Sequence, residues 1–186
     1  MLSHFKTPLE VGLYDIAYKV SILTLIFLLA VNAIATPKFS ELYKKKDLSE
    51  LKKIVRQSSK MIFFCSVPIV AVLLLFPEQI LGLFKDEFIA ASTALVILAC
   101  GQFINAISGS VGNLLKMTNH QVDFQYIALF ATVMNIGMNF YLIPRYSING
   151  AAFASALSMA FVNIVAMIVA YRKLGIVTLY VPGFSK

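Results

Sequence analysis

Five amide side chains lie in stretches of the chain that otherwise carry almost only apolar residues. They are Gln102, Asn105, Asn113, Asn135 and Asn139. An amide in hydrocarbon needs a hydrogen-bond partner, which a neighbouring helix or water must supply. At 100° per residue, Gln102, Asn105 and Asn113 lie broadly on one side of a helix, and Asn135 and Asn139 lie one turn apart. Their chemistry is either hydrogen bonding between helices or the lining of a hydrated cavity, and the sequence leaves both open.

A carboxylate and an ammonium group form a second candidate group near the start of the chain. Asp15 and Lys19 are four residues apart, so on a helix they can form an ion pair. Pairing lowers the cost of holding either charge at depth in a membrane. For Lys19 a structural role and contact with a ligand both stay open. Lys116, at the end of a later apolar stretch, is expected to extend its ammonium group to the membrane surface.

The composition of the chain shows what must position these side chains. Mean hydropathy is +0.81, and 13% of the residues are charged, about half the usual share in soluble domains. Five stretches without Asp, Glu, Lys or Arg contain 18, 17, 28, 21 and 26 residues, and a helix needs about 20 apolar residues to cross a membrane. We therefore predict an all-α membrane protein, a single module over residues 1–186, with five transmembrane helices at about 9–43, 50–76, 88–116, 121–143 and 149–172.

Half of the positive charges lie in one connection between helices. Eight of the 16 Lys and Arg residues fall in the basic loop 38–60, and such loops lie on the cytoplasmic side of membranes. Because the helices then alternate in direction, we expect the N-terminus outside and the C-terminus in the cytoplasm. The net charge of +7 predicts contact with anionic membrane lipids, and not with nucleic acid.

The basic loop is also where helix boundaries are predicted. An amphipathic segment starts at Leu48, and either Asp47 or Ser49 is placed to cap it. Pro37 removes a helix hydrogen bond, so we expect it to kink or fray the last turns of the first helix.

Small residues dominate the start of the predicted fifth helix. Gly150, Ala154 and Ser158 are spaced by four. Lipid is as apolar as leucine, so membrane helices associate where small residues let their backbones approach. We therefore predict a packing groove for another helix at this stripe, with the corner at Pro144 making an antiparallel hairpin of the fourth and fifth helices.

Other chemistry has little support in the sequence. No spacing typical of a metal site or of a disulfide framework is present, and we expect no metal and no cofactor. No acidic pair falls inside a span, and the two histidines are predicted on opposite sides of the membrane. The pattern therefore does not favour an enzyme.

Two blocks of sequence resemble a known family. VGLYDIAYKVSILTLIFLLAVNAIATPKFSEL, residues 11–42, contains a Gly-x-Tyr-x-x-Ala start, a following basic residue and a Pro-x-x-Ser end. NIGMNFYLIPRYSINGAAFASALS, residues 135–158, contains Asn-x-x-x-Asn followed by Ile-Pro-x-Tyr-x-x-x-Gly-Ala-Ala. Together they resemble polysaccharide flippases of the O-antigen type, in the multidrug/oligosaccharidyl-lipid/polysaccharide exporter superfamily.

The resemblance implies an architecture and a place in it. Members have twelve or fourteen helices in two lobes, and the five helices predicted here match the eighth through twelfth. The seventh helix and the amino-terminal lobe would then be missing partners. On this resemblance the chain is expected to be a fragment of the carboxy-terminal lobe or the product of a truncated reading frame, in the inner membrane of a bacterium.

The resemblance also implies a cargo and site residues. A polyprenyl-pyrophosphate-linked glycan is turned from the inner to the outer leaflet for surface polysaccharide, such as that of lipopolysaccharide. Lys19 would contact the anion, and Asp15 would tune Lys19 or carry a coupling proton. The five amides would contact glycan or neighbouring helices. The alternatives are a drug or cation antiporter of the same superfamily, and an inactive or scaffold fragment.

Overall fold

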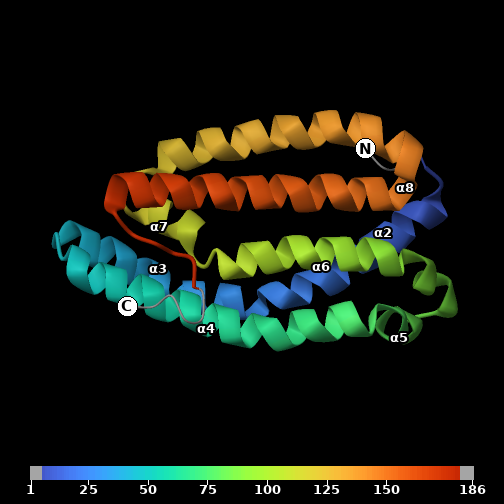
Figure 1. Ribbon diagram of the computed structural model, residues 1–186, viewed down its shortest axis with the longest axis horizontal. Helices are drawn as coiled ribbons and strands as arrows, with labels where there is room; N and C mark the ends of the chain where they lie inside the picture. The colour runs from blue at the N-terminus through green and yellow to red at the C-terminus, as the bar shows by residue number, and fades with distance from the viewer. Residues whose placement is uncertain (1–5, 181–186) are drawn as a thin grey trace.

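The computed structural model describes residues 6–180, and in that range the chain is helical without strands. Figure 1 shows a flat bundle of long helices that run nearly parallel or antiparallel to one another. The elements are α2 (Pro8–Ile22), η1 (Leu23–Leu25), α3 (Ile26–Lys44), α4 (Leu48–Leu75), α5 (Pro77–Gly82), η2 (Asp86–Ala91), α6 (Ser92–Ile107), α7 (Val111–Met117) and α8 (Gln121–Leu174).

Four helical stretches in the described range are long and apolar enough to cross a membrane. They are Pro8–Lys44, Leu48–Leu75, Asp86–Ile107 and Gln121–Leu174. The last has 54 residues and folds back on itself, so it supplies two antiparallel arms (Figure 1). Predicted helices four and five are these two arms. The prediction of an all-α membrane protein is confirmed.

The reversal within α8 lies at Ser147 and not at Pro144. Ser147 has φ 51° and ψ −131°, whereas Pro144 lies within the helix. Gly150 makes the reversal compact: a Cβ on it would lie 2.4 Å from the Leu142 carbonyl oxygen. Pro144 removes one backbone donor but precedes the reversal by three residues. The prediction of a hairpin is therefore right, and its corner is at Ser147.

Two predicted helices are interrupted. The first changes to a 3-10 turn at η1, where Ser66 of α4 donates a hydrogen bond to the Thr24 carbonyl at 3.4 Å. The predicted helix 88–116 is wrong as one element, because the chain breaks between α6 and α7 at residues 108–110, where Gly109 has φ 65°. By contrast, α3 continues through Pro37 to Lys44 without fraying.

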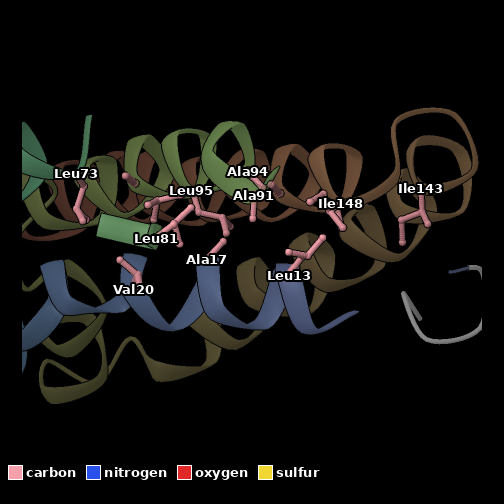
Figure 2. Close-up of a cluster of buried hydrophobic side chains, with 14 residues drawn as sticks. Leu13, Ala17, Val20, Leu73, Leu81, Ala91, Ala94, Leu95, Ile143 and Ile148 are labelled. Carbon is pink, nitrogen blue, oxygen red and sulfur yellow. The ribbon is translucent and has the colours of Figure 1, made fainter. Parts of the chain in front are cut away.

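Apolar packing holds the end of the bundle where α2 begins. Figure 2 shows side chains of α2, α5, α6 and α8 that point toward one another in one cluster. Ala17, Leu81 and Leu95 are fully buried there. Alanines on α6 and α8 let these helices pack closely. Because the hydrophobic effect does not drive helices together in lipid, dispersion contacts between closely packed side chains hold them instead.

Asp47 caps the N-terminus of α4, which settles the choice between Asp47 and Ser49. The Asp47 carboxylate accepts hydrogen bonds from the Glu50 backbone N–H at 3.0 Å and from the Ser49 hydroxyl at 2.8 Å. These bonds favour the charged form, so the pKa of Asp47 lies below its usual value, the Glu50 bond contributing most.

Asp47→Ala is expected to lower the melting temperature of the protein in detergent at pH 7, because the first turn of α4 loses its cap. A depressed carboxyl pKa gives stability that is present above the unfolded pKa, about 3.9, and is lost as the pH falls through the folded value. The difference in melting temperature between the wild type and the variant should therefore shrink as the pH falls from 6 to about 3. A difference that stays constant over that range would contradict this role of the charge.

Candidate functional site

A polar cavity of roughly 530 Å³ lies among α2, α3, α6, α7 and both arms of α8. Its polar lining consists of amides and hydroxyls, with no Asp, Glu, Lys, Arg or His among the lining residues that the structure describes. Phe124, Met159 and other apolar side chains complete the wall. The polar lining residues are Tyr18, Asn32, Asn105, Ser110, Asn113, Thr132, Asn135, Ser155, Ser158 and Asn163.

Three of the five predicted amides come together at this cavity. Asn105, Asn113 and Asn135 line it, although the break between α6 and α7 means that the first two do not share a continuous helix. Asn139 is buried and donates a hydrogen bond to the Asn135 side-chain oxygen at 2.8 Å, within the same arm of α8. Gln102 is 1% exposed and does not line the cavity. Its side-chain oxygen has no partner among the described residues.

Two further asparagines that sequence reasoning missed complete the lining. Asn32 of α3 faces the cavity, and so does Asn163 of α8, which donates to the Met159 carbonyl at 2.9 Å. Each lies in a stretch without charged residues and has no second amide one turn away. The rule that an amide in hydrocarbon needs a partner applies to isolated amides as well as to pairs, and would have found both.

Two buried polar atoms of the lining lack a protein partner in the described range. They are the Asn32 side-chain oxygen and the Ser110 hydroxyl oxygen. A buried polar atom without a partner costs about 1–3 kcal/mol, whereas a polar space of this size readily holds water. The arrangement therefore favours a cavity occupied by water or by a polar ligand over a dry interface between helices.

The break between α6 and α7 adds backbone to the cavity wall. Gly109 and Ser110 both line it. Irregular backbone at membrane depth occurs where it is buried in protein or lines a water-filled space. A Cβ on Gly109 would lie 2.3 Å from the Ser59 hydroxyl oxygen and 3.3 Å from the Thr178 carbonyl oxygen, so only glycine permits both this conformation and this approach.

The predicted charged pair lies outside the cavity. Lys19 Nζ and Asp15 Oδ2 are 2.7 Å apart, and their side chains are 67% and 55% exposed. Neither lines the polar cavity, although Tyr18 beside them does. The two residues thus pair with each other on an outward face of α2. A role for Lys19 toward an anion, or for Asp15 toward a proton, stays a prediction.

The small residues of α8 occupy three different environments. Gly150 packs against the backbone of Leu142, Ala154 is fully buried, and Ser158 lines the cavity while donating to the Ala154 carbonyl at 2.7 Å. Close contact with α6 occurs two residues away from this stripe, where a Cβ on Gly101 would lie 2.8 Å from Ala156.

Lys116 lies at the exposed end of a helix. It is in the last turn of α7, is exposed, and its ammonium group lies 5.0 Å from the centre of the Phe124 ring. Among residues 6–180 no group of three His, Cys, Asp or Glu side chains is placed to hold a metal ion.

Comparison with known proteins relates this arrangement to named membrane proteins. A protein of Haloferax volcanii that is named as a probable low-salt glycan biosynthesis flippase, Agl15, is 30% identical over 157 residues, which cover 84% of this chain and 33% of that protein. A probable flippase of the same organism, AglR, is 24% identical, covering 90% of this chain and 36% of its own length. An uncharacterized membrane protein of Methanocaldococcus jannaschii is 28% identical over 79% of this chain.

The chain thus spans about a third of the length of the curated relatives that it matches. The family model MatE matches residues 1–141, which include α2 through the first arm of α8 as far as Tyr141. This match covers most of the chain and includes most of the cavity lining. The chain is a member of the MatE family.

Proposed function

We propose that this chain forms part of the wall of a membrane passage through which a lipid-linked glycan is turned from one leaflet to the other. The observation that carries the proposal is the cavity of amides and hydroxyls, without charged side chains in its described lining. Two relatives that are named as flippases, one of them in glycan biosynthesis, support it.

The chemistry of the lining suits a sugar. A glycan that crosses hydrocarbon loses hydrogen bonds to water, and this loss is costly unless other donors and acceptors replace them. Each asparagine offers two donors and an acceptor, and each hydroxyl offers one donor and two acceptor positions. A neutral wall supplies these bonds to the sugar part of the cargo without placing a charge beside it.

A drug or cation antiporter is the alternative within the same superfamily. Such a protein would need an acidic group to hold a cation or a proton inside the membrane. None of the described cavity residues is acidic, and the name of one relative, a probable glycan biosynthesis flippase, favours a glycan. We therefore favour a glycan transporter over an antiporter, an enzyme or an inactive scaffold.

Orientation and cellular location are part of the proposal. The prediction of a loop over 38–60 is wrong, because these residues form the end of α3, a short turn at residues 45–47 and the first part of α4. Their positive charge lies at the end of the bundle where α3 and α4 meet, and it favours the cytoplasmic side. The N-terminus would then be outside and the C-terminus in the cytoplasm of a multi-pass protein. A bacterial inner membrane and an O-antigen cargo stay predictions, since the named relatives belong to Haloferax volcanii.

The two-lobed architecture is proposed on the same basis. In a transporter of twelve or fourteen helices, the cavity would face a second lobe across the passage. The exposed apolar residues of α8, such as Leu129 and Val133, at 61% and 62% exposure, would then contact lipid or that lobe.

Access of water to the cavity tests the proposal. In a variant with Cys65 and Cys100 replaced by alanine, Asn135→Cys is expected to react with a charged, water-soluble thiol reagent about tenfold faster than Val133→Cys, because the reactive thiolate forms only in water. Val133 is the control because it lies on the same arm of α8 and faces outward. Equal, slow labelling of both positions in intact membranes would rule out a hydrated wall.

A transport assay distinguishes hydration of the cavity from a role of its amides in transport. In cells that lack their own glycan flippase, this chain together with the second lobe that the proposal requires should restore surface glycan, and Asn113→Leu with Asn135→Leu should reduce it. Val133→Leu should have no effect. Unchanged export in the double variant would reject these amides as cargo contacts even if they are hydrated.

A further inference from the structure

A second cavity, of roughly 760 Å³, lies at the end of the bundle that carries the basic loop. Lysines from three elements converge on it: Lys44 from α3, Lys46 from the turn after α3, and Lys116 from α7. Tyr43, Asn119 and Gln121 add neutral polar groups. The volume falls in the range of about 300–1,000 Å³ that is usual for ligand sites.

The positive charge of this basic cavity is not neutralised by the protein. In residues 6–180, Lys44, Lys46 and Lys116 form no ion pair, and no lining residue is acidic. The nearby carboxylates are already engaged. Glu41 pairs with Lys45 at 2.6 Å, and Asp123 pairs with Lys173 at 2.8 Å. Asp47 caps α4.

Helix dipoles do not explain this charge. Four helix ends lie at the basic cavity. Two are C-termini, of α3 at Lys44 and of α7 at Met117, and two are N-termini, of α4 at Leu48 and of α8 at Gln121. Two negative and two positive helix ends roughly cancel. The lysine side chains therefore determine the sign of the potential, and a bound anion would relieve their mutual repulsion.

One of these lysines has an unusual backbone conformation. Lys46 has φ 58°, in the left-handed region where a helix end normally has glycine. Its N–H bonds to the Tyr43 carbonyl at 3.1 Å, and the Asp47 N–H bonds to the Leu42 carbonyl at 3.0 Å, which closes the end of α3. A lysine is disfavoured in this conformation, so the fold retains a charged side chain where glycine would be more stable.

The location of the basic cavity indicates the source of the anion. The apolar helices end at Lys44 and begin at Leu48 and Gln121, so the cavity is at the boundary between membrane and water. Lys116 contacts Phe124, which lines the polar cavity described above. Leu48 and Met117 give the basic cavity an apolar side. An anion that is attached to apolar chains fits this place better than a free ion does.

We propose that the basic cavity binds the phosphate group of an anionic membrane lipid, with Lys44, Lys46 and Lys116 around the phosphate oxygens. Lysine ammonium groups suit phosphate as compact charges, and basic pockets between membrane helices hold lipid headgroups. This site is independent of transport: it concerns a lipid that the protein retains, whatever cargo it moves.

Native mass spectrometry of the full chain in neutral detergent tests the site directly. Phosphatidylglycerol should bind in a saturable way, and zwitterionic phosphatidylcholine should not compete with it. The triple variant Lys44→Gln, Lys46→Gln, Lys116→Gln should weaken the binding of phosphatidylglycerol by about a hundredfold, because each lysine near a lipid surface changes binding severalfold.

A matched set of charges on α4 provides the control. Lys52, Arg56 and Lys60 lie on one face of that helix, beside another cavity at the same end of the bundle. Lys52→Gln, Arg56→Gln, Lys60→Gln removes the same charge without touching the basic cavity. It should retain binding within about twofold. An equal loss in both triple variants would show attraction to overall charge and overturn the proposal.

Two further experiments test Lys46 alone and distinguish a lipid from a soluble anion. Lys46→Gly should raise or preserve the melting temperature, since glycine adopts the left-handed conformation freely, and should still weaken lipid binding severalfold. Unchanged binding in this stable variant would remove Lys46 from the site. Inorganic pyrophosphate should displace the lipid only at a large excess. Displacement at equal concentration would assign the cavity to a soluble anion instead of a lipid.

Discussion

Gly150→Ala is expected to destabilise the protein by about 3 kcal/mol or more. The new Cβ would lie 2.4 Å from the Leu142 carbonyl oxygen and 2.7 Å from its carbonyl carbon. Both are backbone atoms of the same reversal in α8, so no side-chain rotation relieves the overlap. The two arms would have to separate at the turn, and Ile143 and Ile148 would leave their buried positions.

Heat-induced unfolding in detergent measures this effect. Gly137→Ala is the matched control, because it lies in the first arm of α8 and a Cβ there meets nothing within 4 Å. Alanine in an open helical position is favourable by about 0.5–1 kcal/mol, so the control should keep or raise the melting temperature. Similar melting temperatures for the two variants would mean that the reversal at Ser147 does not depend on the close approach of Gly150 to the Leu142 backbone.

Gly109→Ala is expected to cost about 2–4 kcal/mol, from a left-handed conformation that alanine disfavours and from overpacking. Ser59 is 1% exposed, and its hydroxyl oxygen would lie 2.3 Å from the new Cβ. That hydroxyl has no hydrogen-bond partner in the described range, so it is able to rotate. The Ser59 Cβ, at 3.1 Å, and the Thr178 carbonyl, at 3.3 Å, have less freedom.

A second substitution separates the two causes. Gly109→Ala combined with Ser59→Ala should recover only part of the lost stability, because removing the hydroxyl leaves about 1–2 kcal/mol from the backbone conformation. Gly12→Ala, in an open part of α2, should be close to neutral. Full recovery in the double variant would show that the break between α6 and α7 does not depend on a left-handed residue.

The positions of the long helices were predictable because one physical constraint determines them. Charged side chains are expensive in hydrocarbon, so stretches without them mark the spans, and α4 at Leu48–Leu75 differs from the predicted 50–76 by two residues or fewer at each end. Breaks inside spans were not predictable. Ser108, Gly109 and Ser110 are tolerated in a membrane helix, so their types do not mark a break. The chain unwinds there at a place where Ser59 and Thr178 lie close to Gly109, and this contact between distant segments cannot be read from the local sequence.

The faces of the helices were harder to predict than their ends. In a soluble protein the apolar face of a helix points to the core, but in a membrane both faces are apolar and the pattern carries little information. Hence the sequence did not show that Lys19 lies on an outward face of α2 while Tyr18 lines the cavity. Asn32 and Asn163 were missed because neither has a second amide one turn away.

The neutral lining of the cavity has a consequence for energy coupling. An elementary charge that moves across a membrane gains or loses about 2.3 kcal/mol per 100 mV. The cavity residues that the structure describes carry no formal charge, so in the proposed passage this wall would add no gating charge. Sensitivity to voltage would then have to come from a charged cargo or from other parts of the protein.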